Sequence, residues 1–355
     1  MVTYRRATAA DYININAFHN RIDKPNRSIE QFYWEFRDCP FGPAIYVVAE
    51  DGEKIIGTNC VIPIDLIDSK GNIIKSGKSE DTLVDPVYRG QNIFNNIYDS
   101  LFEESKKQGV SVIWGFTSAT KAFEKLGFEI PCCHHQALAV NKVLSSYNFL
   151  KTLNPKNSLV DNIKIFGLSF VAKLKYKLNI LPKLFEYEMF DDIGLTDISE
   201  KLIQDNLSDS EKCFAIFQNE TFQKWRIYEN PNYFKMYSYV FKNLKGEIIA
   251  LIEVNTTVTK VAYINQSTFC VSLSEDLKAK ILRKVSEGLF QKGNIIIRTW
   301  LFNTSELNKK EISTFEKAGF YYLNRGIGMV WKKLDDSKID PINFYLSRIS
   351  SQGII

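Results

Sequence analysis

The sequence predicts an α+β fold, in which mixed sheets are flanked by helices, and it predicts that this fold occurs twice. Stretches with the period of strands and stretches with the period of helices follow each other along residues 1–140. Two anchors then recur, because 93 positions separate Trp34 from Gly127 and 94 separate Trp225 from Gly319. A chain of 355 residues is also longer than one ordinary core, so two domains are expected.

The first copy opens with a short strand at 2–6 and a helical segment that starts near Ala9. Ser28 and Gln31 are spaced as a capping box, which predicts that a helix begins there. Asp51-Gly52 separates two apolar stretches, 45–50 and 54–67, and so predicts a hairpin. The other expected elements are a strand at 73–84, a helix at 91–108, a strand at 111–116, a helix at 119–126 that ends at Gly127, and final strands within 128–140.

The stretch 81–97 carries the clearest chemical signal. Thr82-Leu83-Val84 is a short β-prone run that Asp85-Pro86 ends. Arg89-Gly90 then leads into an amphipathic helix. A helix N-terminus after a glycine turn offers unpaired backbone N–H groups and the positive end of the helix dipole, which together suit a pyrophosphate group. Arg89 adds a fixed positive charge.

This stretch resembles the coenzyme A loop of the GNAT superfamily of N-acetyltransferases. One common form of that loop reads Pro-x-Tyr-Arg-Gly-x-Gly-Ile-Phe. Residues 86–94 match it at every fixed position except one, where Asn92 replaces the second glycine. Asn tolerates left-handed backbone angles better than most residues. Downstream, residues 123–128 resemble the Tyr-Glu-Lys-Leu-Gly-Phe motif that closes the same domain.

The resemblance implies acetyl-CoA as co-substrate and direct attack of an amine on the thioester in a ternary complex. It also implies two GNAT-like domains, each with a mixed, mostly antiparallel sheet. The strand positions expected to pair with the pantetheine arm are Thr82, Leu83 and Val84. The backbone N–H groups expected to hold the pyrophosphate are those of Arg89, Gly90, Gln91, Asn92, Ile93 and Phe94.

Four segments are expected along the chain. They are a GNAT-like domain with the coenzyme A loop at 1–144, a helical connector at 145–186, a second GNAT-like domain at 187–335 and a C-terminal tail at 336–355. In the connector, Lys173, Lys175, Lys177 and Lys183 form a basic face. This pattern favours a solvated helix face, with a membrane-surface or anionic-ligand role as the alternative.

The second copy lacks the coenzyme A loop. Its hairpin is expected around Lys245-Gly246, followed by a strand at 261–271, a helix at 274–291 and a strand at 294–301. Residues 271–276, at the position of the loop, contain no glycine and no arginine, and they add Glu275 and Asp276. Two carboxylates disfavour a pyrophosphate, so we expect one cofactor site, in the first copy.

Composition excludes other classes of protein. Apolar residues make up 45% of the chain and charged residues 24%, as in soluble globular proteins. A net charge of +4 gives no case for a nucleic-acid partner. No apolar run reaches the ~18 residues of a membrane span, and the first residues lack the apolar core of a signal peptide. Six scattered cysteines favour reduced thiols, so we expect a cytoplasmic protein. A duplicated chain can mimic a dimer internally, so we expect either a monomer or a dimer.

Acetyl transfer needs a base that deprotonates the amine. Glu80 and Asp81 are adjacent carboxylates on the expected cofactor strand and are the candidate catalytic residues. Because successive strand residues face opposite sides, at most one of them should reach the cleft, and Glu80 is preferred. A salt bridge or a solvated strand end is the alternative interpretation of either carboxylate.

The general acid has no clear candidate. Many GNAT proteins have a tyrosine at the position of Phe123 and an asparagine at the position of Phe116, and a phenylalanine cannot donate a proton. Thr117 and Ser118 are the nearest polar side chains in the sequence. These departures indicate either a different donor or loss of catalysis.

Residues 132–135, Cys-Cys-His-His, suggest a metal site, but known zinc sites leave two or more residues between paired ligands. No metal is therefore expected, and His134 or His135 is an alternative base on the acceptor side. The aromatic residues Trp34, Phe36, Trp225 and Tyr228 are expected to pack in the core or between domains rather than to bind substrate.

The favoured function is N-acetyltransferase activity towards an amine of a small molecule, sugar or peptide. Two alternatives stay open. One is a non-catalytic protein that binds acyl-CoA or a partner. The other is a tandem-GNAT aminoacyltransferase of the cell-wall type.

Overall fold

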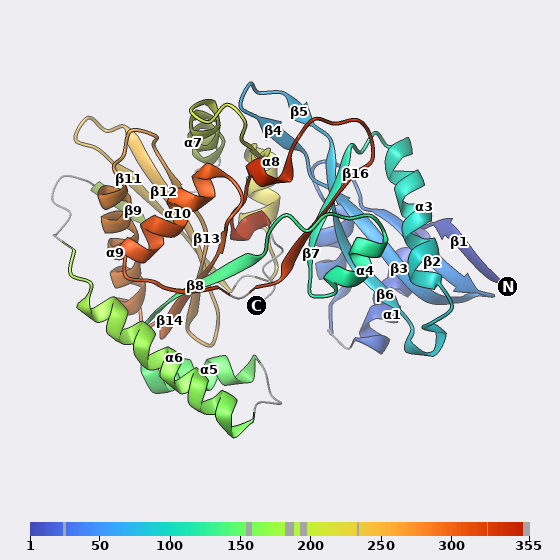
Figure 1. The fold of residues 1–355 in the computed structure, drawn as a ribbon, viewed down its shortest axis with the longest axis horizontal. Coiled ribbons are helices and arrows are strands. Elements are labelled where there is room, and N and C mark those ends of the chain that lie inside the picture. The colour runs from blue at the N-terminus through green and yellow to red at the C-terminus, as the bar shows by residue number, and fades with distance from the viewer. Residues whose placement is uncertain are drawn as a thin grey trace. The chain divides into compact units, whose positions relative to one another are not determined.

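The computed structural model describes residues 1–23, 26–153, 158–181, 188–191, 197–232, 234–324 and 326–350 (Figure 1). These residues fall into two compact units. Unit 1 contains Met1–Pro131, Ile216–Asn232 and Gly328–Pro341, and unit 2 contains Cys132–Ala215, Tyr233–Ile327 and Ile342–Ile355. Each unit is thus assembled from segments that are far apart in the sequence.

Unit 1 is built on a mixed six-stranded sheet with the order β1-β2-β3-β6-β7-β16. Only β6 and β7 are parallel neighbours, and the other pairs are antiparallel. The strands are β1 Val2–Arg6, β2 Ile45–Asp51, β3 Lys54–Pro63, β6 Ser76–Val84, β7 Val112–Thr117 and β16 Gly328–Lys333, and a small hairpin adds β4 Leu66–Asp68 and β5 Ile73–Ile74. The hairpin predicted across Asp51-Gly52 is confirmed, whereas the strand expected at 73–84 is interrupted at Lys75.

Helices cover both faces of this sheet. Ile45 and Val47 of β2 face α3, where they pack with Ile97 and Leu101, while Tyr46 between them packs on the other face against Phe32. The helical elements of unit 1 are α1 Tyr12–Ile22, α2 Ile29–Phe32, α3 Ile93–Lys107, α4 Thr120–Lys125 and α8 Glu220–Gln223, with short 3-10 turns at Ala9–Asp11 and Pro86–Tyr88. The predicted capping box is confirmed, because Ser28 and Gln31 each accept a hydrogen bond from the other's backbone N–H.

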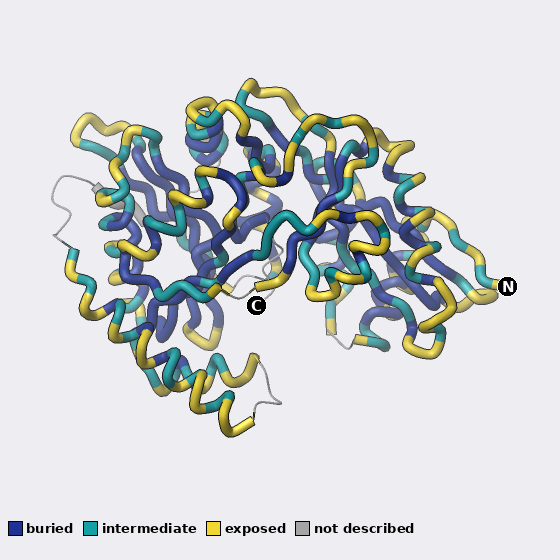
Figure 2. Tube along the Cα trace, viewed as in Figure 1, coloured by how far each residue is buried: buried dark blue, intermediate teal, exposed yellow. Residues whose placement is uncertain are grey.

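Unit 2 contains a mixed seven-stranded sheet with the order β15-β8-β14-β13-β12-β11-β9. The strands are β8 His134–Val140, β9 Glu188–Asp191, β11 Lys235–Lys242, β12 Ile248–Thr256, β13 Val261–Phe269, β14 Ile296–Phe302 and β15 Tyr321–Leu323, and a separate short pair joins β10 Phe214–Ile216 to β17 Phe344–Tyr345. The helices are α5 Val143–Thr152, α6 Leu159–Leu178, α7 Asp197–Ser208, α9 Glu275–Gln291 and α10 Glu306–Lys317, and 3-10 turns follow at Pro341–Asn343 and Arg348–Ser350. In both units the sheet strands form the buried core (Figure 2).

The two copies exchange their last strands. Strand β8 follows α4 of the first copy but pairs with β14, and β16 follows β15 of the second copy but pairs with β7. The expected boundary at 144 differs from these units, because it assumes that each copy keeps its own last strand. The expected boundary at 186 and Lys183 both lie outside the described residues.

The duplication is visible in a pair of π-helical turns within unit 1. Trp34 lies in the turn Tyr33–Arg37 and Trp225 in the turn Lys224–Tyr228. The two indole rings stack with centroids 5.4 Å apart. Each indole Nε1 donates to the backbone oxygen of the other tryptophan, at 2.9 and 2.7 Å. The prediction that these residues serve packing agrees with this buried, reciprocal contact.

All six cysteines lie in the described ranges and are free thiols. In the same part of the chain, no helix has both the length and the apolar character needed to cross a bilayer.

Candidate functional site

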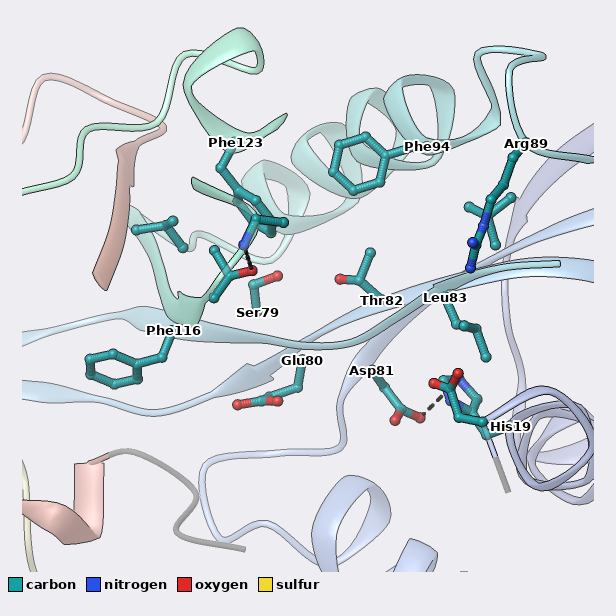
Figure 3. Close-up of a pocket in the computed structure, with 15 residues that line it drawn as sticks. His19, Ser79, Glu80, Asp81, Thr82, Leu83, Arg89, Phe94, Phe116 and Phe123 are labelled. Carbon is teal, nitrogen blue, oxygen red and sulfur yellow. Dashed lines mark hydrogen bonds and ion pairs between the residues drawn. The ribbon is translucent and has the colours of Figure 1, made fainter. Parts of the chain in front are cut away.

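A β-bulge shapes strand β6 at the centre of the site. Thr58 of β3 pairs with Leu83 and Cys60 pairs with Glu80, so Asp81 and Thr82 together oppose Asn59. Asp81 has a φ of 54°, in the left-handed region. Figure 3 shows that Glu80 and Asp81 consequently point to the same side of β6, whereas Ser79 and Thr82 point to the other. The expectation that only one of the two carboxylates reaches the cleft is wrong, because the bulge breaks the strand alternation on which it rested.

A cavity opens where β6 and β7 separate. These parallel strands pair only from Ser76 to Lys78 on β6, opposite Val112–Trp114 on β7. Beyond that point the cavity has a volume of about 550 Å³. Its lining includes both candidate carboxylates and the predicted cofactor-strand residues Thr82, Leu83 and Val84, and it extends to Arg89 and Phe94.

A second cavity, of about 320 Å³, lies at the N-terminus of α3 and shares Val84, Arg89 and Phe94 with the first. Gly90 has a φ of 82°, and a Cβ there would meet no atom within 4 Å. Asn92 is the N-cap residue with a φ of 59°, so it adopts the left-handed conformation that the sequence expects of it. The Asn92 side chain bonds Asn95 and Asn96 rather than capping a backbone N–H. Of the residues predicted to hold the pyrophosphate, Gln91 does not line this cavity, and the others do.

Asp81 is held as a carboxylate by a buried network. Arg27 donates two hydrogen bonds to it, at 3.0 and 2.9 Å, and the Tyr46 hydroxyl donates a third at 2.5 Å. His19 Nε2 lies 3.2 Å from the same carboxylate. Burial alone would raise the pKa of Asp81, but His19 and Arg27 lower it below its ordinary value. Asp81 therefore anchors the bulge and is a weak proton acceptor.

Glu80 has one tight partner and remains accessible. Lys78 Nζ lies 2.5 Å from Glu80 Oε1, and the Glu80 side chain is 26% exposed. Lys78 is itself almost fully buried, and burial lowers its pKa although Glu80 opposes that shift. Of the two adjacent carboxylates on β6, Glu80 is thus the more exposed one, and it is not enclosed by an arginine.

A third carboxyl, that of Glu35, is buried close to this pair. Burial, together with the charges of Glu80 and Asp81, raises the pKa of Glu35 to about 8. Glu35 lies on the π-helical turn that carries Trp34. The Glu35 carboxyl therefore favours its protonated form more than an exposed glutamate does.

Hydroxyl groups hold the opposite side of β6. The buried Tyr98 hydroxyl on α3 lies 3.0 Å from Ser79 Oγ and 3.1 Å from Thr82 Oγ1. Thr82 Oγ1 also donates to Asn59 Oδ1 at 2.8 Å. These contacts fix the bulged strand against both β3 and α3.

Three phenylalanines line the cavity. Phe94 and Phe123 lie on the side of β6 to which Ser79 and Thr82 point, and Phe116 lies on the side of Glu80 (Figure 3). Thr117 is a polar neighbour whose hydroxyl accepts from the Ala119 N–H at 3.0 Å. The two phenylalanines at the expected acid positions, Phe116 and Phe123, therefore face the cavity. Ser118 does not line it.

His134 and His135 belong to unit 2 and do not line this cavity. His134 packs against Trp300 with ring centroids 4.5 Å apart and accepts from the Ile327 N–H. Burial lowers the pKa of His134 to about 4. Among the described residues, no group of three or more His, Cys, Asp or Glu side chains could hold a metal ion.

The second copy retains the bulge and the separated strands. The register between β12 and β13 shifts after Glu253, which leaves Asn265 at the position of Asp81. β13 and β14 pair only from Val261 to Tyr263 on β13, opposite Ile296–Arg298 on β14. The geometry that opens the cavity in unit 1 is therefore also present in unit 2.

In unit 2 the C-terminal tail fills the space between the separated strands. The buried Arg348 donates to Asn265 Oδ1 at 2.5 Å and to Asn255 Oδ1 at 3.3 Å. Its guanidinium lies 4.2 Å from the Tyr263 ring centroid and 5.3 Å from that of Trp300. Asn308 of α10 bonds the backbone of Leu346. The cavity that remains beside Ser267 and Tyr345 has a volume of only about 40 Å³.

Sequence reasoning missed the residues that set the charge state of the site, namely His19, Arg27, Glu35, Tyr46 and Lys78. Two of them carried a weak signal. Glu35 is a lone acid within the aromatic run 32–36, and Lys78 is a cation in the first, buried half of β6. His19 and Arg27 come from the first helix and the loop after it, and no local pattern brings them to β6.

Comparison with known proteins gives one family match. Residues 3–131 match a family model described as an acetyltransferase (GNAT) domain. No curated protein matches the sequence significantly. The first copy is therefore a GNAT domain.

Three solved structures are similar in fold. A conserved protein of unknown function from Enterococcus faecalis, described as a probable N-acyltransferase, has 7% identity and a TM-score of 0.66, with 94% of this chain and 73% of that chain covered. A GCN5-related N-acetyltransferase from Anabaena variabilis has 10% identity and a TM-score of 0.64, with the same coverage. A tandem GNAT protein from the clavulanic acid biosynthesis pathway has 11% identity and a TM-score of 0.57, with 95% of this chain and 100% of that chain covered. The chain as a whole thus has the tandem GNAT fold.

Glu35→Gln is expected to change how stability depends on pH. A carboxyl whose folded pKa is raised to about 8 stabilises the folded state below its unfolded pKa of about 4.3, and this stability is lost as the pH rises towards 8. Between about pH 5 and about pH 8, wild type should lose more free energy of unfolding than Glu35→Gln, as measured by urea denaturation. The exposed Glu53→Gln is the matched control. Equal losses in all three proteins would show that Glu35 is not the buried titrating group.

Arg348→Ala should destabilise unit 2 by about 2–3 kcal/mol, because it removes charge-assisted hydrogen bonds and leaves Asn255 and Asn265 buried without this donor. The readout is the free energy of unfolding from urea titration. Lys338→Ala, which removes an exposed cation of the tail, should have almost no effect. A loss below about 0.5 kcal/mol for Arg348→Ala would show that the tail is not part of the folded core.

Proposed function

We propose that this tandem GNAT protein is an N-acetyltransferase that moves the acetyl group of acetyl-CoA to an amine of a small molecule, sugar or peptide. The cavity at the separated strands β6 and β7 supports this function. At that cavity an accessible carboxylate, an arginine and a helix N-terminus come together. In the second copy the equivalent space is filled, so the reaction is assigned to the first copy.

The loop after β6 fits the pyrophosphate of coenzyme A. The first turn of α3 has no side-chain cap, so its backbone N–H groups are available to an anion at the positive end of the helix dipole. Arg89 is exposed and makes no salt bridge among the described residues. The open space at Gly90 lets a phosphate approach the backbone closely.

The free edge of β6 fits the pantetheine arm. Because β7 stops pairing at Lys78, the edge of β6 at Thr82, Leu83 and Val84 that faces away from β3 has no strand partner. An extended amide chain can take the place of the missing strand and use those backbone groups. The apolar side chains of Phe94 and Phe123 would then exclude water from the thioester.

We assign the general base to Glu80 rather than to Asp81. Asp81 is tied to Arg27 and Tyr46, and its pKa is lowered, so protonating it would break buried hydrogen bonds. Glu80 keeps exposed surface at the cavity. As the amine nitrogen bonds to the acetyl carbon and the C–S bond breaks, the proton of the amine passes to Glu80. The sulfur leaves as a thiolate and takes its proton from solvent, because Phe116 and Phe123 cannot supply one.

The second copy has a structural role in this proposal. Strand β16 completes the sheet of unit 1 beside β7, and Val330 of that strand lines the cavity. Residues 216–232 support the Trp34 turn from within the same unit. The second copy thus contributes to the site by completing the first unit.

The free thiols support a reducing compartment such as the cytoplasm.

Two alternative functions remain, and they differ in what they do with acetyl-CoA. A non-catalytic acyl-CoA-binding protein would bind it without turnover, which the phenylalanines at the acid positions favour. A cell-wall aminoacyltransferase would not need to bind it.

The test is release of free coenzyme A thiol from acetyl-CoA in the presence of a panel of amino sugars, polyamines and peptide amines. At least one amine should stimulate release by wild type, and Glu80→Gln should reduce the rate by about 10²–10⁴-fold while acetyl-CoA still binds. The exposed Glu53→Gln is the control and should behave as wild type. Binding without turnover for every amine would favour the non-catalytic alternative, and unchanged turnover in Glu80→Gln would remove Glu80 as the base.

A further inference from the structure

The α5–α6 hairpin, which comprises α5 (Val143–Thr152) and α6 (Leu159–Leu178), packs on the rest of unit 2 through one face of α6. Ser169, Ala172 and Tyr176 of that face are buried. Arg283 of α9 donates to the Tyr176 backbone oxygen at 2.7 Å, and its guanidinium lies 3.6 Å from the Tyr176 ring centroid. Ala172 packs in a cluster with Leu138 of β8. The orientation of α6 is therefore fixed by contacts within the unit.

Residues along the opposite side of α6 are exposed (Figure 2), and most of them are apolar. Leu159 is 77% exposed, Ile163 is 65% exposed and Phe170 is 54% exposed. The exposed apolar residues of this face are Leu159, Val160, Ile163, Phe166, Phe170, Val171, Leu174 and Leu178. They recur every three or four residues and so form one continuous stripe along the helix. Single exposed apolar residues are ordinary, but a continuous stripe marks an interaction surface.

Positive charge is concentrated on the same segment. Residues 142–183 contain eight lysines and one acidic residue, Asp161, which gives a net charge of +7. The whole chain has +4, so the rest of the chain has −3. Lys142, Lys164 and Lys177 are exposed and make no salt bridge in the described part of the chain.

The charge and the shape of this surface indicate which partner it binds. Two copies of the hairpin would bring two strongly positive segments together, which disfavours self-association through this face. The stripe is convex and runs the full length of a 20-residue helix, about 30 Å, so it suits a flat partner better than a groove. An anionic bilayer offers both an apolar layer for the stripe and negative headgroups for the lysines.

We propose that the α5–α6 hairpin docks this protein on the surface of an anionic lipid bilayer. α6 lies along the membrane surface, the stripe from Leu159 to Leu178 enters the boundary between headgroups and acyl chains, and the lysines contact the headgroups. The hairpin does not span the bilayer. This inference does not depend on the proposed acetyl transfer, because it uses neither the cavity of unit 1 nor its residues.

The experiment is flotation of the full chain with vesicles. One set contains equal molar parts of phosphatidylglycerol and phosphatidylcholine, and the other contains phosphatidylcholine alone. Wild type should float with the anionic vesicles only, and added salt should weaken binding because it screens the lysines. Lys164→Glu and Lys177→Glu should each weaken binding by about fivefold or more, since one lysine near the surface is worth about that factor. The double variant Ile163→Ser/Phe170→Ser should abolish it.

Leu244→Ser is the matched control, because Leu244 is also an exposed leucine of unit 2, at 83%, but lies away from the hairpin. It should float as wild type does. All substituted side chains are exposed, and retained circular dichroism would confirm folding. Failure of wild type to float with anionic vesicles would overturn the proposal, as would equal flotation of the double variant. Self-association of wild type that the double variant loses would instead assign the surface to a second copy.

Discussion

The separation of two parallel strands is the constraint on which both halves of this molecule depend. In unit 1, β6 and β7 pair over three residues and then diverge. The divergence leaves the edge of β6 without a strand partner, and the buried bond network around Asp81 keeps that strand bulged at the same point. The backbone N–H and C=O groups of an open strand edge need hydrogen-bond partners, because leaving them unpaired away from water costs free energy. A ligand, another segment of the chain or water can be that partner.

The two copies meet this constraint differently. In unit 2 the tail fills the gap, and Arg348 binds Asn265 at the position of Asp81. In unit 1 the gap remains a cavity of about 550 Å³ next to the Arg89-Gly90 turn. Exchange of β8 and β16 makes each sheet depend on the other copy for one of its strands. The second copy is therefore needed for the fold of unit 1 even without a coenzyme A loop of its own. Without β16 the sheet of unit 1 would end at β7.

The sequence was sufficient for the features that rest on local chemistry. The glycine turn and helix start at Arg89-Gly90, the capping box at Ser28 and the duplication anchored by Trp34 and Trp225 all follow from short patterns and spacings. It was insufficient where one residue changes the geometry, as at Asp81, whose left-handed backbone angle turns two adjacent carboxylates to one side. It also could not assign β8 and β16, because both possible partner sheets offer an equivalent edge. The charge state of the site depends on residues such as Arg27 that reach β6 only through the tertiary fold.

The two copies are expected to differ in acetyl-CoA binding, with a site in the first copy and none in the second. Calorimetric titration of acetyl-CoA into the full chain would distinguish one site from two, because it returns both affinity and stoichiometry. We expect one acetyl-CoA per chain with a dissociation constant near micromolar, about −8 kcal/mol. Gly90→Glu should abolish that binding, because it places a carboxylate at the N-terminus of α3. Binding of two acetyl-CoA molecules per chain would contradict a single site in the first copy. Binding of acetyl-CoA by the Gly90→Glu variant would contradict the position of that site at the start of α3.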